Sequence, residues 1–222
     1  MKKILFICPY PLKVAAGQRL KFEPHFKQLE LSGYEITVHS FMNEGLWKIA
    51  SKNGFIFQKV LFTLWGLLRR IYLVFFLRKF DCVYIFMNVF PFGPPILESL
   101  YIKFSKKIIF DIEDNLLSDE IGSINFIASI LKSKNKAKYL IQNVDHVIAS
   151  SPDLKEKCNI ISGKDNAIFI PPTLEKNRFI PKQNFNSNNQ KLVIGWTGTF
   201  SSRIFIDMLI PHLEELYKKC PF

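Results

Sequence analysis

The chain has 222 residues, of which 48% are hydrophobic, and its formal net charge is +11. This length and apolar content allow a substantial core, which excludes a disordered chain and predicts one large or two small globular domains. The 30 Lys and Arg outnumber the 19 Asp and Glu, which predicts attraction to nucleic acid, an anionic bilayer or a phosphorylated ligand. Charge alone does not choose among these three partners.

The four cysteines show no paired spacing of the kind found in metal or redox sites, so we expect a reducing, cytoplasmic environment. Residues 1–9 begin with an apolar run that is too short for a signal peptide and that ends at Pro9. We interpret this run as a buried first strand. The four histidines are isolated in the sequence and suggest no hydrolytic triad.

Six short apolar runs recur along the chain and are predicted to be strands. They cover residues 4–8, 35–40, 82–86, 107–111, 146–149 and 167–170. Several are nearly continuous in Val, Ile and Phe, which is typical of parallel strands covered on both faces. Segments with helical spacing separate them, so the pattern predicts an α/β fold with a doubly wound, Rossmann-like parallel sheet.

A polar, asparagine-rich stretch at 181–190 predicts a linker. The strand and helix rhythm then restarts, with a strand expected at 191–196, a turn at 197–199, and a helix capped by Ser201 or Ser202 that continues to about Lys219. We therefore expect a first domain at 1–180, a linker at 181–190 and the start of a second, truncated domain at 191–222. One strand and one helix would leave apolar surface uncovered, so we expect the rest of that domain to be missing.

The segment 46–80 has no Asp or Glu, yet it contains seven basic and nine aromatic residues. Within it, 60–77 is apolar, but Arg69 and Arg70 would cost about 2.5 to 3.5 kcal/mol each in a bilayer, so a transmembrane helix is not expected. One unbroken helix would align Lys48, Lys52, Lys59 and Arg70 in a cationic stripe, whereas a break at Gly54 or Gly66 would lose this alignment.

Two interpretations of this segment stay open. It is a surface helix on an anionic membrane, or a core-packing helix with a solvated basic edge. In the first case the membrane-binding residues are Lys48, Lys52, Lys59, Trp65, Arg69 and Arg70. No nucleic-acid motif is present, so nucleic acid is not expected as a partner.

The loop after the first strand contains a single glycine, Gly17, followed by Gln18 and Arg19. A glycine at a helix start lets backbone N–H groups approach an anion, so this loop is a candidate phosphate site. The alternative is that Gly17 only forms a tight turn. The dinucleotide fingerprint GxGxxG is absent, which argues against a nicotinamide or flavin dehydrogenase.

Several short motifs occur along the chain in an order that resembles the opening of retaining GT-B glycosyltransferases of the family 4 type. These motifs are 3–7, Pro11, 17–20, Leu29, 33–38, 80–85, 144–151, 170–172 and 194–199. The resemblance covers essentially the whole chain, with Tyr34 where that family usually has histidine. It implies the first domain of a GT-B architecture and transfer of a hexose from a nucleotide-diphosphate sugar.

Three carboxylates follow a predicted central strand: Asp111, Glu113 and Asp114. Open α/β sheets bind ligands at this end of their strands, so these are the candidate catalytic residues that touch acceptor or sugar hydroxyls. Asp111 and Glu113 would lie on one side of an extended strand and could share a cation. In the family a histidine stands at Glu113. The alternative is that Asp114 and Asp119 only favour the start of the next helix.

A rival hypothesis takes residues 111–113 as the metal-binding acidic motif of single-domain GT-A transferases. The restart at 191 argues against it. In the GT-B hypothesis Gly17, Gln18 and Arg19 line the donor cleft, while Gly198, Thr199 and Arg203 face the diphosphate. No metal or other cofactor is then required, because amides and cations stabilise the leaving diphosphate.

The expected function is therefore hexose transfer from a nucleotide sugar to a saccharide or lipid-linked acceptor, in cell-surface polysaccharide or glycolipid synthesis. The protein would be cytoplasmic and peripheral to the anionic cytoplasmic membrane. A separately encoded carboxyl-terminal half is a further expected partner. The alternative is a truncated, non-catalytic chain that binds membrane and acceptor.

Overall fold

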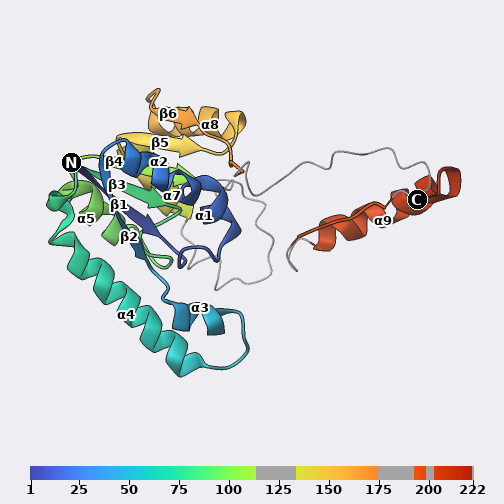
Figure 1. Cartoon of the computed structure of the whole chain (residues 1–222), viewed down its shortest axis with the longest axis horizontal. Helices are drawn as coiled ribbons and strands as arrows, with labels where there is room; N and C mark the ends of the chain where they lie inside the picture. The colour runs from blue at the N-terminus through green and yellow to red at the C-terminus, as the bar shows by residue number, and fades with distance from the viewer. Residues whose placement is uncertain (114–133, 175–192, 199–202, 222) are drawn as a thin grey trace. The chain divides into compact units, whose positions relative to one another are not determined.

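The computed structural model describes residues 1–113, 134–174, 193–198 and 203–221 (Figure 1). The chain divides into two units, Met1–Arg178 and Phe179–Phe222. The first unit contains a six-stranded, entirely parallel sheet with the strand order β2-β1-β3-β4-β5-β6. The strands are β1 (Lys2–Cys8), β2 (Tyr34–Ser40), β3 (Cys82–Phe86), β4 (Ile108–Ile112), β5 (His146–Ala149) and β6 (Ala167–Phe169).

The predicted Rossmann-like sheet is confirmed, because all six apolar runs form strands with ends close to those expected. Most Val, Ile and Phe side chains of the central strands β1, β3 and β4 are buried against helices on both faces, as in other parallel sheets. The helices of the first unit are α1 (Ala16–Lys21), η1 (Glu23–His25), α2 (Phe26–Leu31), α3 (Glu44–Ala50), α4 (Ile56–Val74), η2 (Leu77–Lys79), α5 (Ile96–Phe104), α7 (Lys134–Asn143) and α8 (Pro152–Ser162).

The larger core lies on the sheet face that α4, α5, α7 and α8 cover. Its fully buried residues include Leu5, Ile7, Val83, Ile85, Phe110, Ile112, Tyr101 and Leu140. The opposite face packs against α1 and α2 through a cluster of aromatic rings. There Phe6 of β1 stacks on Phe22 with 5.4 Å between ring centroids, and Phe22 also contacts Tyr84 and Phe86 of β3. Aromatic contacts of this kind add to the area buried.

The strand order places a topological switch point between β1 and β3, because the chain leaves β1 toward β2 on one side and later returns to β3 on the other. In open α/β sheets, ligands bind in the crevice outside the carboxyl ends of the strands at this point. The loops after β1, β3 and β4 are therefore the segments in which to look for a site.

The segment 46–80 is not a single helix, because α3 and α4 are separated by a turn at Gly54 and Phe55, which both have positive φ. The alternative with a break at Gly54 is confirmed, so the cationic stripe that an unbroken helix would align is not formed. Gly66 does not interrupt α4. It lets the helix approach Phe41, since a Cβ built at Gly66 would lie 2.8 Å from the Phe41 ring and 3.0 Å from its carbonyl oxygen. In the described part of the chain, no helix is both long and apolar enough to cross a membrane.

The second unit contains α9 (Arg203–Lys219), which has its expected carboxyl end. The strand expected at 191–196 is not formed by its described residues, 193–196. The physical reason is that a strand is stabilised by pairing, and the described residues supply no partner for it. The predicted linker at 181–190 and the capping Ser201 and Ser202 lie outside the described residues.

Candidate functional site

The loop between β1 and α1 is fixed by the side chain of Gln18. Its amide oxygen accepts a hydrogen bond from the Tyr10 N–H at 2.9 Å, and its amide nitrogen donates to the Tyr10 carbonyl at 3.0 Å. Glu23 accepts from the N–H of Lys13, which has a left-handed backbone conformation. Gln18 is fully buried, so its predicted place in the lining of a donor cleft is wrong. Its hydrogen bonds hold the loop from inside.

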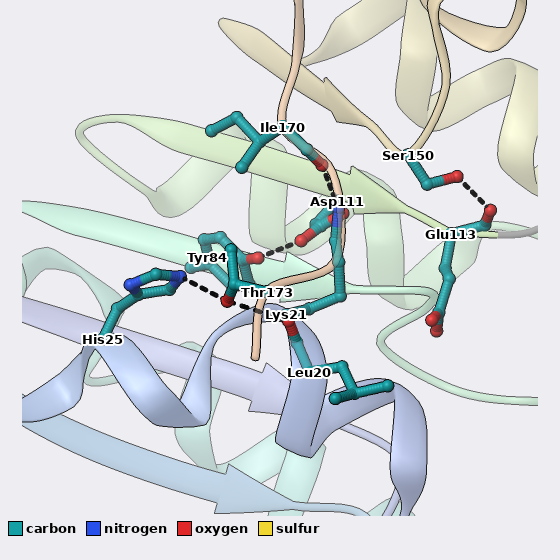
Figure 2. Close-up of polar contacts among 9 residues, drawn as sticks. All are labelled: Leu20, Lys21, His25, Tyr84, Asp111, Glu113, Ser150, Ile170 and Thr173. Carbon is teal, nitrogen blue, oxygen red and sulfur yellow. Dashed lines mark hydrogen bonds and ion pairs between the residues drawn. The ribbon is translucent and has the colours of Figure 1, made fainter. Parts of the chain in front are cut away.

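Glu113 lies directly after β4, and its carboxylate occupies the space over Gly17. A Cβ added at Gly17 would lie too close to the Glu113 side chain, 3.1 Å from its carboxyl carbon and closer still to Oε2. The backbone carbonyl of Glu113 accepts a hydrogen bond from the Ser150 hydroxyl at the end of β5 (Figure 2). Two sequence-predicted residues, almost a hundred positions apart, therefore meet at the carboxyl edge of the sheet. The glycine provides the room for this contact.

Asp111 is buried in an ionic network. One of its oxygens lies 3.2 Å from the Lys21 ammonium, and the other accepts a hydrogen bond from the Tyr84 hydroxyl (Figure 2). Burial raises the pKa of Asp111 above its usual value, while Lys21 opposes this shift. The contact of Asp111 with sugar hydroxyls stays a prediction: its side chain is about 1% exposed and its oxygens face Lys21 and Tyr84, and it also contributes to the lining of a cavity.

Tyr84 stays protonated in this network. Burial raises its pKa well above the usual value, and the neighbouring Asp111 carboxylate adds to the shift. The phenol is therefore a hydrogen-bond donor to Asp111 at neutral pH. Sequence analysis did not single out Lys21 or Tyr84, since a lysine in a short helix and a tyrosine in a strand carry no distinctive signal.

The segment after β6 crosses the aromatic face of the sheet and is attached to α1 (Figure 2). The Lys21 ammonium donates to the Ile170 carbonyl at 2.9 Å, and the Thr173 N–H donates to the Leu20 carbonyl at 2.7 Å. The Thr173 hydroxyl also lies 3.2 Å from Nε2 of His25. Lys21 thus joins α1, β4 and this segment at one point.

Beneath this segment lies a cavity of about 350 Å³. Its walls are mainly apolar, with Phe6 and Phe22 on one side and Ile109 and Ile148 on the other. The charged and polar part of the lining consists of Asp111, its partners Lys21 and Tyr84, and His25.

The loop after β3 is held by a second buried ion pair. Glu98 of α5 accepts hydrogen bonds from the N–H groups of Val89 and Phe90, and Lys136 of α7 donates to the Phe90 and Phe92 carbonyls. The Lys136 ammonium lies 3.3 Å from the Glu98 carboxylate. Burial lowers the pKa of Lys136, and Glu98 opposes this shift. Sequence analysis missed this pair as well, because its members belong to different helices.

Four of the remaining predicted residues lie outside the described part of the first unit. Asp114 and Thr199 lie outside the described residues, whereas Gly198 and Arg203 belong to the second unit, where Arg203 lies 3.6 Å from Asp207. Arg19 is partly exposed on α1, next to Gln18.

Two hypotheses placed a metal ion at Asp111, either shared with Glu113 or bound by the acidic motif 111–113. The geometry of Asp111 does not support them, because its oxygens face Lys21 and Tyr84. In the described part of the chain, no three His, Cys, Asp or Glu residues lie close enough together to hold a metal ion.

The burial of Arg70 contradicts its predicted role in membrane binding, because this residue is only 1% exposed. One of its terminal nitrogens donates to the Cys8 carbonyl at the end of β1, and the Tyr101 hydroxyl donates to the Arg70 carbonyl. Lys48, Lys52 and Trp65 are exposed, whereas Lys59 and Arg69 are partly buried. Arg70 therefore supports the carboxyl edge of the sheet from behind.

No family model and no curated protein sequence matches the chain. Among solved structures, it is similar to Anabaena Alr3699/HepE, crystallised in complex with UDP and glucose, at 14% identity and a TM-score of 0.41. That match covers 80% of this chain and 46% of the HepE chain, so this chain spans about half of that protein's length.

A proposed quinone reductase from Klebsiella pneumoniae is also similar, at 11% identity and a TM-score of 0.34, with coverage of 73% of this chain and 83% of that one. These two neighbours differ in what they are described to do. At such identities and TM-scores, neither assigns an activity to this chain.

Proposed function

We propose that this chain is the acceptor-side part of a GT-B type glycosyltransferase. In this proposal it acts in the transfer of a hexose from a nucleotide-diphosphate sugar to a saccharide or lipid-linked acceptor. The single observation that carries the proposal is the Glu113 carboxylate, held over Gly17 at the carboxyl edge of the parallel sheet beside its switch point. The sequence resemblance to family 4 glycosyltransferases supports the same class.

A carboxylate at this position favours hydroxyl groups over phosphate. It accepts hydrogen bonds from hydroxyls, and charge-assisted bonds of this kind are stronger than neutral ones. The Glu113 side chain already fills the space over Gly17, so a phosphate could enter it only by displacing that side chain. We therefore assign Gly17 and Glu113 to an acceptor or sugar hydroxyl, which modifies the earlier expectation that Gly17 binds the donor diphosphate.

The buried groups around Glu113 act as supports rather than as reacting groups. Lys21 and Asp111 tie α1 to β4, and Ser150 ties the end of β5 to the Glu113 carbonyl. The residues that contact a substrate must be held in position by neighbouring residues that are themselves fixed. In the proposal, Glu113 orients the acceptor hydroxyl and accepts its proton as a general base.

The donor diphosphate is assigned to the second unit, at Gly198, Thr199 and Arg203. Backbone N–H groups and a cation there would stabilise the charge that develops on the leaving diphosphate. Arg203 is exposed, with Asp207 as its neighbour in α9. This part of the proposal rests on the sequence pattern alone.

The test measures UDP and GDP released from a panel of UDP- and GDP-hexoses with membrane lipid extract as acceptor. The 222-residue chain is assayed alone and together with the product of any adjoining reading frame that encodes a donor-binding half. We expect release in the combined assay and a fall of at least about a hundredfold in Glu113→Gln, with Glu30→Gln on α2 as the matched control. No release from any donor in either assay, or equal release by Glu113→Gln, would overturn the proposal.

A further inference from the structure

Helix α4 presents a long apolar face to solvent. Its exposed large side chains recur every three or four residues and therefore lie on one side of the helix. They are Ile56, Phe57, Val60, Leu61, Leu64, Trp65, Leu68, Ile71, Tyr72 and Phe75, the last just beyond the helix end. Phe57 is 74% exposed and Phe75 is 78% exposed, so the face is bare from end to end. We refer to these ten residues as the α4 face.

The opposite side of α4 attaches the helix to the protein. Gly66, Arg70 and Leu73 are buried there, and all three lie in the second half of the helix. The first half has no buried residue, and Figure 1 shows it leading away from the sheet layers beside α3. At about 1.5 Å per residue, the 19 residues span roughly 28 Å. The α4 face is therefore a surface ridge and not part of the core.

Positive charge surrounds this ridge. Lys48 and Lys52 are exposed on α3 and just after it, and Arg78 and Lys79 are exposed beyond the other end of α4. No Asp or Glu occurs between Gly45 and Phe80. An apolar helix face with cations at both ends fits the interface of an anionic bilayer, where the rings enter the acyl boundary and the cations meet headgroups.

A second copy of this chain fits the same ridge poorly. A two-fold symmetric contact would bring the same patch of both copies together. Cations at the ends of the ridge would then approach cations of the other copy, and the segment offers no acidic residue to neutralise them. The charge of the ridge therefore selects an anionic partner.

We propose that the α4 face binds the surface of an anionic lipid bilayer, with α4 lying in the plane of the interface. This differs from the sequence-based hypothesis in its residues. Arg70 is excluded because it faces the core, and the aromatic and aliphatic residues of the α4 face carry the contact. The inference does not depend on sugar transfer.

The test is co-sedimentation of the full 222-residue chain with vesicles of phosphatidylcholine, with and without a quarter of phosphatidylglycerol, at low salt. The chain binds the anionic vesicles, and Leu64→Gln/Leu68→Gln lowers the partition coefficient at least tenfold. Ile160→Gln is the matched control, because Ile160 is an exposed aliphatic residue on α8. Circular dichroism and urea unfolding confirm that each variant is folded.

Charge is tested separately. Lys48→Gln/Lys52→Gln lowers binding about 25-fold, since each basic residue near an anionic surface contributes about fivefold. Lys27→Gln/Lys157→Gln, on α2 and α8, leaves binding unchanged.

Brominated lipid provides a direct readout of depth. In the Trp47→Phe/Trp196→Phe variant, Trp65 is the remaining tryptophan, and its fluorescence is quenched on vesicle binding. Absence of sedimentation with anionic vesicles, or equal binding by Leu64→Gln/Leu68→Gln, overturns the inference. A lipid-independent dimer that this double variant abolishes, without vesicle binding, assigns the ridge to a second copy and overturns it as well.

Discussion

The carboxyl edge of the sheet and the α4 face depart from the usual distribution of side chains in opposite ways. At the edge, charged groups such as Lys21 and Asp111 are buried, and each has a partner within the protein. On α4, large apolar groups such as Trp65 and Phe75 are exposed to water. Buried charge is tolerated only with internal partners, whereas exposed apolar surface needs no internal partner and is available to an external one. The difference separates residues that maintain the fold from residues that meet another surface.

The largest expected effect follows from breaking the buried pair. Lys21→Met leaves the Asp111 carboxylate without its cation, and removing one member of a buried pair costs about 3 to 5 kcal/mol. Urea unfolding of the variant measures the loss of free energy of unfolding.

The matched control for this change is Lys21→Met/Asp111→Asn, which removes both charges together. We expect it to recover most of the lost stability, because no uncompensated charge remains. Additive losses in the double variant would show that the two side chains do not act as a pair.

An intermediate effect on the free energy of unfolding is expected when substitutions on the two sides of α4 are compared. Leu73→Ala should lower the free energy of unfolding by about 2 to 5 kcal/mol, because Leu73 belongs to the main core. Leu68→Ala should change it by less than about 0.5 kcal/mol, because its side chain is 58% exposed. Equal losses for these two leucines in thermal or urea unfolding would mean that the α4 face is covered within the protein.

The smallest expected effect concerns pH. Burial lowers the pKa of His39 below its ordinary value of 6.5, and Arg70 and Arg69 add to this shift. Between the lower folded pKa and 6.5, the unfolded chain binds more protons, so stability falls as the pH decreases through this window.

The measurement is urea unfolding between pH 7.5 and pH 5.5 on the wild type and on His39→Gln. We expect the variant to lose less stability as the pH falls. An identical pH dependence in the two proteins would exclude His39 as its source.

The sheet was predictable because continuous runs of Val, Ile and Phe are a local signal. The same holds for Gly17 and Glu113, which could be found from their places after predicted strands. The ion pairs of Lys21 with Asp111 and of Glu98 with Lys136 could not be found, because their members are far apart in sequence and meet only through the sheet topology. The burial of Arg70 could not be predicted, because it depends on which part of α4 packs on the sheet: the buried residues of α4 all lie in its second half.

The central claim is that the Glu113 carboxylate over Gly17 contacts a sugar hydroxyl. Saturation-transfer NMR on the 222-residue chain with a panel of hexoses and short saccharides tests it most directly. A hydrogen bond to a charged group contributes about 1.5 to 3 kcal/mol, so we expect Glu113→Gln to weaken saccharide binding about tenfold or more and Glu30→Gln to leave it unchanged. Undiminished binding by Glu113→Gln, or no saccharide signal from the wild-type chain, would contradict the claim.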